Sequence, residues 1–411
     1  MAGFKINRTN DLLFNTSNIY KMNIPLAQPD ITQKEIDAVI RVLKSKRLSL
    51  GEWTEKFEKA VAQYAGVKYA IAVANGTCGL HLLMRTFGVA DGDEVITTPF
   101  SFIASANCIL FERAKSVFVD IDPLTLCIDP ERIEEKITKK TKAILAVDIF
   151  GHPCDWGRLT AIAKKHNLTI IEDSCEALGS KFAIRNSQFA NCGNFGDASV
   201  FAFYPNKQIT TGEGGMIITN NAKIARLCRA MRNQGRLNYK WLQHDILGYN
   251  YRLDEMSAAL GYAQMQRIGS ILSKRTKVAN LYYKKLQIMN SELRNNGLPE
   301  IQIPYVDKCA QVSWFVYVIR LSPKYTAKDR NNIILKLQRH GIACSNYFPP
   351  IHLQPFYQKL FWYKKGDFPI TEAIAQRTIA LPFYGQMAKK QVKYIVQTLT
   401  KIILSSKLNN G

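Results

Sequence analysis

Short apolar runs alternate with longer segments of helical periodicity through the first two-thirds of the chain. The apolar runs cover residues 69–75, 93–98, 116–122, 143–150 and 168–174, and the helical patterns between them cover 77–88, 104–114, 130–137 and 155–167. Continuous apolar strands separated by helices are typical of a parallel sheet that is covered on both faces. We therefore predict an α/β fold built on a mainly parallel sheet.

The pattern changes in the last third of the chain. Helical spacing begins at about Lys223, and a second helical pattern begins near Arg252 and continues well past Gly269. Residues 314–321 then read as a strand. Residues 326–341 read as a helix that starts with a capping box and stops at a glycine.

The length of 411 residues favours two domains of ordinary size. We divide the chain into a loosely held N-terminal arm (1–23), a large domain (24–267) and a smaller C-terminal α+β domain (268–411).

The composition is that of a globular protein, with 47% hydrophobic and 21% charged residues. No apolar run reaches the roughly 18 to 20 residues that a membrane span needs, and the first twenty residues lack the pattern of a secretory signal. The nine cysteines show neither a CxxC pair nor metal-like spacing. We expect reduced thiols in a cytoplasmic protein, with no metal site and no insertion into a membrane.

The formal net charge of +22 favours anionic partners. Lysines and arginines are spread along the chain, with only short clusters such as residues 136–142. Three interpretations stay open: a lysine-rich solvated surface, attraction of a nucleotide-bearing substrate, and binding to nucleic acid or a membrane. Because no zinc-finger spacing or RNP-like motif occurs, we do not expect a nucleic-acid partner.

Polar residues stand where several predicted strands end, which is where parallel sheets usually bind ligands. Residues 75–77 form a turn before a helix, so their amide groups and the Thr77 hydroxyl suit a phosphate, although an ordinary capped helix has the same pattern. Asp173 ends another run. It is either a structural carboxylate or the group that keeps a pyridine nitrogen protonated, as pyridoxal phosphate requires.

Lys207 follows Asp173 and lies between two further apolar runs, residues 199–205 and 214–219. A lysine at this place can form a Schiff base with a cofactor aldehyde and can then move protons. The glycines of residues 212–215 allow the backbone to pack close beside a ligand. A phosphate turn, a strand-end aspartate and a strand-end lysine in this order together predict a pyridoxal-phosphate site.

With these residues in place, the chain resembles the DegT/DnrJ/StrS family of pyridoxal-phosphate sugar aminotransferases, which have the aspartate aminotransferase (type I) fold. The resemblance extends from "IPLAQPDIT" to "LPFY" and includes "EDSCEALGS", "FAFYPNKQITTGEGG", "GYNYRLDEMSAALGYAQ" and "NYFPPIHLQPFY". It implies that Lys207 binds the cofactor and that Asp173 pairs with its ring nitrogen. It also implies that Phe102 stacks on the ring, while Gly76 and Thr77 hold the phosphate.

Four further residues take roles from the resemblance. Glu176 stands near the cofactor phenolate, where the family often has glutamine. Asn250 matches the asparagine that reaches the phosphate from the other subunit, which implies a homodimer with shared sites. Tyr347 and His352 lie in the segment that helps line the sugar pocket, with ordinary packing as an equal alternative.

One position departs from the family pattern. The strand before the lysine usually carries a serine that donates to the phosphate, and Ala202 stands there instead. A hydrogen bond to a charged group contributes about 1.5 to 3 kcal/mol, so cofactor binding is weaker unless Ser199 or another donor compensates.

The resemblance implies transfer of an amino group from glutamate to a keto group of a nucleotide-linked (deoxy)sugar, for polysaccharide or glycoconjugate biosynthesis. A related branch that dehydrates keto-sugars has histidine in place of the lysine, so Lys207 argues for transamination. A non-catalytic regulator with the same fold and a basic nucleic-acid-binding protein are the remaining alternatives.

Overall fold

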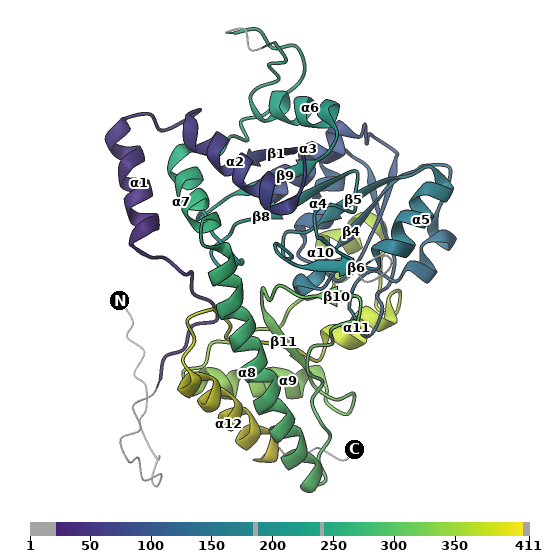
Figure 1. The fold of residues 1–411 in the computed structure, drawn as a ribbon. Helices are drawn as coiled ribbons and strands as arrows, with labels where there is room; N and C mark the ends of the chain where they lie inside the picture. The colour runs from purple at the N-terminus through teal and green to yellow at the C-terminus, as the bar shows by residue number, and fades with distance from the viewer. Residues whose placement is uncertain (1–21, 184–187, 239–241, 406–411) are drawn as a thin grey trace, which may run out of the picture.

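The computed structural model describes residues 22–183, 188–238 and 242–405 (Figure 1). Nearly all of the predicted N-terminal arm (1–23) lies outside the described residues. The described part contains no helix that is both long and apolar enough to cross a membrane.

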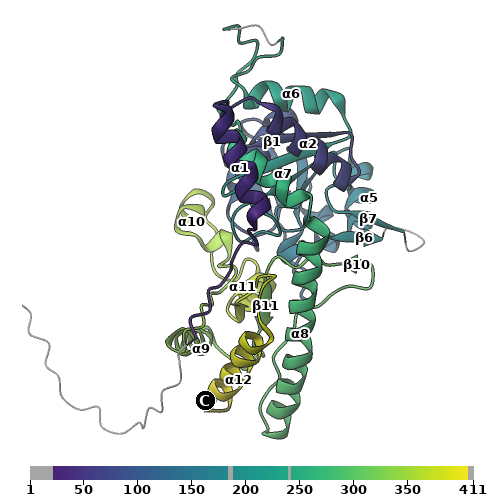
Figure 2. The ribbon, with the colours of Figure 1, turned by 60° about the vertical axis from the view of Figure 1, so that its left-hand side comes forward.

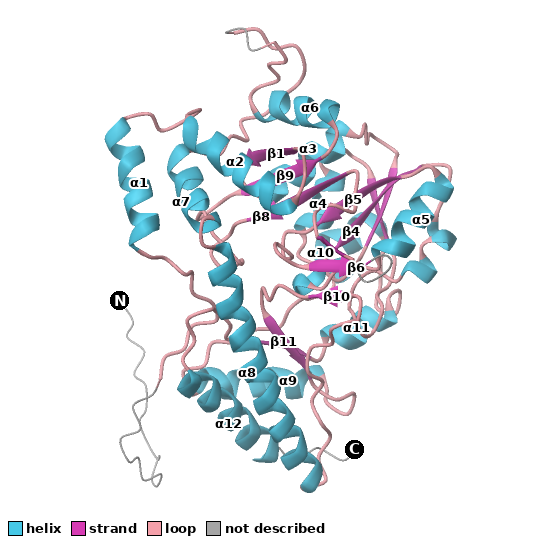
Figure 3. Ribbon diagram, viewed as in Figure 1, coloured by secondary structure: helices cyan, strands magenta, loops and turns pink. Residues whose placement is uncertain are grey.

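A seven-stranded sheet forms the centre of the large unit (Figure 3). Its order across the sheet is β1 (Tyr69–Val73), β9 (Gly215–Thr219), β8 (Ala198–Ala202), β5 (Thr169–Asp173), β4 (Thr141–Val147), β2 (Glu94–Thr97) and β3 (Lys115–Phe118). Only β9 is antiparallel to its neighbours, so the prediction of a mainly parallel sheet is confirmed. Because β8 and β9 are adjacent, the segment that joins them returns across the carboxyl edge of the sheet.

Helices cover both faces of this sheet (Figure 1). They are α2 (Glu52–Ala65), α3 (Gly76–Thr86), α4 (Ala104–Leu110), α5 (Trp156–His166), α6 (Ala222–Arg232) and α7 (Glu255–Met265), while α1 (Gln33–Ser45) packs on α7 farther from the sheet. Successive side chains of a strand point to opposite faces, and on β1 Ile71 and Val73 join one core while Ala70 and Ala72 join the other. Burial on both faces explains why the strands are continuous apolar runs.

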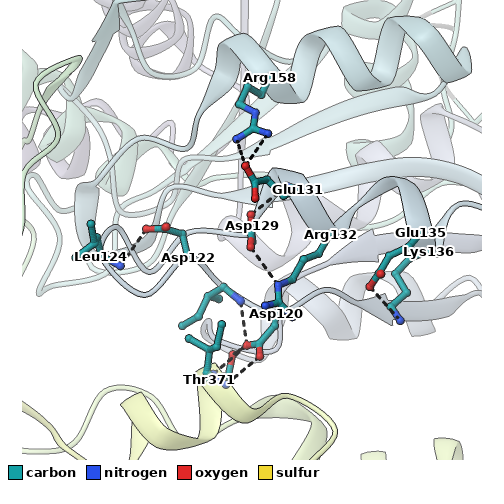
Figure 4. A network of polar contacts seen from close by, with 12 residues as sticks. Asp120, Asp122, Leu124, Asp129, Glu131, Arg132, Glu135, Lys136, Arg158 and Thr371 are labelled. Carbon is teal, nitrogen blue, oxygen red and sulfur yellow. Dashed lines mark hydrogen bonds and ion pairs between the residues drawn. The ribbon is translucent and has the colours of Figure 1, made fainter. Parts of the chain in front are cut away.

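The predicted helix over residues 130–137 is wrong. The structure has two short 3₁₀ turns there, Pro130–Arg132 and Glu134–Lys136. The Asp129 carboxylate accepts the amide of Glu131 and also contacts Arg132, so local side-chain bonds favour a tight turn over an α-helix (Figure 4).

A second core forms around α8 (Ile268–Asn295), which extends away from the sheet with α12 (Lys389–Ser405) beside it (Figure 2). This unit also contains α9 (Ala327–Arg339) and the antiparallel pair β11 (Tyr317–Arg320) and β12 (Thr378–Leu381). A small sheet of β10 (Ala310–Gln311), β6 (Lys181–Ala183) and β7 (Phe189–Asn191) joins the two units. We retain the division at residue 268 as a proposal, and note that α8 begins there.

The predicted capping box of α9 is present, with reciprocal bonds between Thr326 and Asp329, and Gly341 follows the helix with φ +74°. The helical pattern that begins near Arg252 does not run unbroken past Gly269. It is interrupted after Met265, where Arg267 leaves helical geometry and binds the carboxylates of Asp30 and Glu35.

The chain returns from the small unit to the edge of the large sheet through η4 (Ile351–Leu353), α10 (Pro355–Phe361) and α11 (Pro369–Ala375). The Asp120 carboxylate, just beyond β3, accepts the amides of Ile370 and Thr371, each at 2.9 Å (Figure 4). The Tyr357 hydroxyl donates to Asn107 on α4. These bonds hold the segment of α10 and α11 against β3.

Candidate active site

A cavity of about 870 Å³ opens at the carboxyl ends of the central strands. Seven of the nine predicted site residues line it: Gly76, Thr77, Phe102, Asp173, Glu176, Lys207 and Tyr347. These residues come from four separate strand-to-helix or strand-to-strand connections and from the small unit. The fold therefore brings together groups that are far apart in the sequence.

Asp173 is the last residue of β5, and its side chain is buried at the base of the cavity. Its Oδ2 accepts the hydroxyl of Ser105 at 2.7 Å, and its Oδ1 accepts the amide of Cys175 at 3.2 Å. These two donors fix the orientation of the carboxylate. A ligand nitrogen that carries a proton would meet an anion already held in place.

Lys207 lies in the connection between β8 and β9, where the sequence predicted it. Its Nζ is 3.4 Å from Glu176 Oε1 and 4.0 Å from the centre of the Phe315 ring. The side chain is 12% exposed, so the amine faces the cavity rather than bulk solvent. The amine thus lies between an aromatic face and a carboxylate.

Buried contacts hold the lysine loop against the small unit. Gln208 donates to the carbonyls of Glu176 and Ser313, at 2.6 and 3.0 Å. Arg275 of α8 donates to the carbonyl of Asn206 and to those of Trp314 and Phe315. Burial lowers the pKa of the Arg275 guanidinium to about 10, which leaves it charged at neutral pH. The loop position is thus set by one side chain within the motif, Gln208, and one outside it, Arg275.

Glu176 is also buried, and burial raises the pKa of its carboxyl even though the Lys207 ammonium opposes that shift. Its second oxygen accepts the amide of Phe150 at 2.8 Å. The carboxyl therefore has one partner in the backbone and one in the lysine, and it stands between the cavity wall and the amine.

The start of α3 faces the cavity with Gly76 and Thr77. The Asn75 side chain caps the helix by accepting the amide of Cys78 at 2.9 Å. The first intrahelical backbone bond joins the amide of Gly79 to the carbonyl of Asn75, so the amides of the first turn are placed for a ligand. This arrangement suits an anion such as a phosphate.

At two positions in this region, atoms of a neighbouring segment come so close to the backbone that only glycine fits. A Cβ on Gly76 would come within 2.9 Å of the Ala202 side chain, and one on Gly215 would come within 2.6 Å of the Asn75 backbone. Ala202 also lines the cavity. A small side chain at 202 and no side chain at 76 therefore leave this corner open next to the helix start.

Of the alternatives left open for Ala202, compensation by Ser199 has no support in the structure. The Ser199 hydroxyl is fully buried and lies 2.9 Å from both the Glu172 carboxylate and the Gly193 carbonyl. It is three residues earlier on β8, so it points to the opposite side of the sheet from Ala202.

Phe102 lines the cavity from the large unit and Tyr347 lines it from the small unit. The Phe102 ring is 59% exposed, so one face is open to an incoming planar ligand. Burial raises the pKa of the Tyr347 hydroxyl, and the neighbouring Glu176 charge adds to this effect. The tyrosine hydroxyl is therefore neutral at physiological pH.

Two predicted residues lie away from the cavity. His352 is fully buried, with its Nε2 3.0 Å from the Glu372 carboxylate and its ring packed on Phe368. This placement matches the packing alternative for His352. Asn250 is exposed and bridges Asn233 through the backbone, outside the cavity of its own chain.

Sequence reasoning missed Ser105, Phe315, Gln208 and Arg275, which contact the site or its loop. Ser105 lies within an apolar helix pattern and Phe315 within a predicted strand, so neither carried a signal of its own. Their functions depend on contacts with segments that are distant in the sequence.

Comparison with known proteins agrees with this geometry. Residues 29–400 match the DegT/DnrJ/EryC1/StrS aminotransferase family. GDP-perosamine synthase of Escherichia coli O157:H7 is 36% identical over 379 residues, which cover 92% of this chain and 98% of the relative.

Two solved structures are similar over nearly the whole fold. Helicobacter pylori PseC, an aminotransferase involved in the biosynthesis of pseudoaminic acid, has a TM-score of 0.86 and 30% identity, covering 94% of this chain and 100% of that one. The PLP form of the putative sugar aminotransferase Spr1654 from Streptococcus pneumoniae has a TM-score of 0.85 and 26% identity, covering 93% and 98%. The chain therefore belongs to the DegT/DnrJ/EryC1/StrS aminotransferase family, and its cofactor is pyridoxal phosphate.

Proposed function

We propose that this aminotransferase moves an amino group from glutamate to a keto group of a nucleotide-linked (deoxy)sugar. The observation that carries the proposal is the placement of Lys207 and Asp173 in one cavity, with the open helix start of α3 on its wall. When bound, pyridoxal phosphate supplies an aldehyde that accepts amino groups and a ring that withdraws electrons.

The residues of the cavity fit this group. The first amides of α3, with the Thr77 hydroxyl, would hold the phosphate. Asp173 would keep the ring nitrogen protonated, and its carboxylate is pre-oriented by the Ser105 hydroxyl. The exposed face of Phe102 would cover the ring on one side.

Lys207 is the group that we propose moves the proton. A primary amine can take a proton from the carbon of the bound substrate and return it at a neighbouring atom, provided that the amine is neutral at that moment. Glu176, 3.4 Å away, holds the same amine when it is an ammonium. The carboxylate would thus fix the position of Lys207 between proton transfers.

The names of similar proteins support the substrate class. One relative is a GDP-perosamine synthase, and one similar structure is an aminotransferase involved in the biosynthesis of pseudoaminic acid. We assign Tyr347 to the sugar side of the cavity because this residue lines the cavity from the small unit. His352 would act there only indirectly, through the segment that it packs.

We further propose a cytoplasmic homodimer with shared sites. All nine cysteines lie within the described residues and are free thiols, which supports a reducing compartment. Asn250 is exposed and outside its own cavity, so it is available to complete the phosphate site of a second copy.

A spectral experiment tests the proposal. Glutamate should convert the aldehyde form of the bound cofactor to the amine form, and a panel of nucleotide-linked keto-sugars should then be screened for the one that restores the aldehyde band. Failure of every amino donor to change the spectrum would reject transamination. A change with glutamate that no nucleotide-linked sugar reverses would reject the substrate class alone.

A further inference from the structure

A short exposed apolar surface on α10 has no role in the chemistry above. It consists of Phe356, Leu360 and Trp362, with exposed fractions of 41%, 56% and 86%, and we name it the α10 knob. Phe356 and Leu360 are four residues apart and share one face of the helix. In Figure 2 the helix projects from the left side of the molecule, away from the central sheet.

The opposite face of the same segment is firmly anchored. Tyr357 is fully buried and its hydroxyl donates to Asn107, and the Tyr363 hydroxyl donates to the carbonyl of Ser116. Ile351, ahead of the helix, donates its amide to the carbonyl of Pro99. The knob is therefore held out by fixed contacts, and its exposure does not come from a loose helix.

Trp362 has an unusual backbone for its size. It caps α10 in the left-handed region, with φ +63°, where a glycine is the ordinary residue. A bulky side chain is uncommon in this region. Because the Trp362 indole is exposed, its position gains no free energy from burial within the chain. Both facts point to a partner that contacts this side chain.

Lysines surround the knob. Lys359, Lys364 and Lys365 are exposed on the same short segment, and Asp367 is the one exposed acid among residues 355–368 of the described chain. Residues 268–411 hold 22 lysines and arginines against 6 aspartates and glutamates, so this part carries +16 of the total +22. α9 also lies at the left in Figure 2, and its exposed residues include Lys328, Lys336 and Arg339.

We propose that the α10 knob docks the protein on an anionic lipid bilayer, with the three apolar side chains at the interface and the adjacent lysines on the headgroups. Exposed tryptophan beside lysine suits the boundary between anionic headgroups and acyl chains, which offers both an apolar layer and negative charge. Duplex nucleic acid offers the charge without a layer for Leu360. A second copy of this chain offers little negative charge to the lysines beside the knob, since residues 268–411 carry +16.

This docking lies on the surface and requires no spanning helix. It places the cavity close to a bilayer without using any cavity residue as a contact, because none of the three knob residues lines the cavity. The interaction is independent of the proposed transfer reaction.

Sedimentation with vesicles tests the proposal, using the full-length holoenzyme. Vesicles of mixed phosphatidylglycerol and phosphatidylcholine should bind the protein at low salt, and pure phosphatidylcholine vesicles should not. Trp362→Ala should weaken binding about tenfold. The triple variant Lys359→Gln, Lys364→Gln, Lys365→Gln should weaken it about fivefold for each lysine removed.

A matched control removes the same charge elsewhere. Lys164→Gln on α5 with Lys277→Gln and Lys284→Gln on α8 should leave the affinity for anionic vesicles within about twofold, since these lysines are exposed and their helices lie on the side of the molecule opposite to α10 in Figure 2. Subtracting the fluorescence spectrum of Trp362→Phe from that of the wild type gives the emission of Trp362. This emission should shift to shorter wavelength when anionic vesicles are added.

Three results would overturn the proposal. They are no binding of the wild type to anionic vesicles, equal losses in the two lysine triples, and no vesicle-dependent shift of the Trp362 emission. If Trp362→Ala instead changes the oligomeric state, and the emission of Trp362 is already that of a buried indole without lipid, a second copy covers the knob and the bilayer is not the partner.

Discussion

Lys207 is the residue on which the proposed chemistry depends most directly. Replacement by alanine removes both the covalent partner of the cofactor and the proton carrier, so Lys207→Ala should lower turnover by about 10⁴-fold or more. Borohydride reduction of the wild type, followed by peptide mapping, should place the label on the peptide that contains Lys207. Lys223→Ala, at an exposed position on α6, should keep both label and turnover. Label on another lysine would refute the assignment.

Asp173→Asn tests the electrostatic part of the site. An amide has nearly the same shape and still accepts the Ser105 hydroxyl, but it cannot keep a ring nitrogen protonated. The variant should retain bound cofactor and lose about 100-fold or more of its turnover. The Ser105 hydroxyl only orients the carboxylate, so Ser105→Ala should lower turnover about tenfold. Near-normal turnover of Asp173→Asn would show that the electron-withdrawing partner lies elsewhere.

Glu176 links the site to stability and pH. Burial raises the pKa of its carboxyl in the folded protein, so the folded state favours the protonated form. The contribution of this carboxyl to the free energy of unfolding is fully present below the ordinary pKa of 4.5, and it is lost as the pH rises through the raised pKa. In cofactor-free protein, Glu176→Gln should therefore gain in Tm relative to wild type as the pH rises, with little difference in acid. A constant difference across pH would contradict the buried-carboxyl account.

At this scale, residues that end an apolar run were predictable and residues that act through packing were not. Asp173 and Lys207 interrupt apolar patterns at strand ends, so their polarity was itself the signal. Ser199 could be excluded as the compensating donor from the sequence alone, because it is three residues from Ala202 on β8 and side chains of a strand alternate between its faces. The role of Arg275 depends on three carbonyls from two distant segments, which no local pattern reveals.

Among the elements, the break between α7 and α8 is held by charge. Arg267 binds Asp30 and Glu35, and the three side chains are 13%, 7% and 0% exposed. Arg267→Leu would leave two buried carboxylates without the guanidinium that they share and should lower the free energy of unfolding by about 3 kcal/mol in urea titrations. The exposed pair of Arg294 and Glu300 provides the control, since Arg294→Leu should leave the urea midpoint unchanged.

The same cluster predicts a pH dependence. Burial raises the pKa values of Asp30 and Glu35, but hydrogen bonds outweigh burial and hold both pKa values below their ordinary values. These hydrogen bonds come from Arg267 and Lys274 to Asp30, and chiefly from Thr32 to Glu35. The stabilisation is therefore present above the ordinary values and lost as the pH falls through the lowered ones. The difference between wild type and Arg267→Leu should shrink in acid. A difference that grows in acid would exclude this ion pair as its source.

Elements with a long apolar pattern were predicted well, and short connections were not. The strands of the central sheet and the capped helix α9 follow from their own sequences. Residues 130–137 have helical spacing, yet the carboxylate of Asp129 organises a turn, so a side-chain bond decided the local structure. The interruption at Arg267 likewise depends on partners more than 200 residues away in the chain.

For the whole molecule, the shared-site proposal predicts complementation between two inactive variants. Lys207→Ala lacks the amine, and Asn250→Ala should impair cofactor binding in the neighbouring subunit. In a mixed dimer one site takes both defects and the other takes neither, so subunit exchange should restore up to half of the sites in each heterodimer. Exchange without recovered turnover, or full turnover by a dilute monomer, would show that each site is built from one chain.

The helix α8 has a consequence for how the chain can be divided. Its first turns, with Ile268 and Ile271, belong to the core beside α2, while Tyr282, Leu286 and Leu293 belong to the core of the small unit. At about 1.5 Å per residue its 28 residues extend for roughly 40 Å without a linker. A fragment that stops at residue 267 would therefore lose part of its own core as well as its neighbour. Expression of the large unit alone should yield aggregates. A chimera of two related proteins should fold only if the two cores that α8 joins come from the parent that supplies α8.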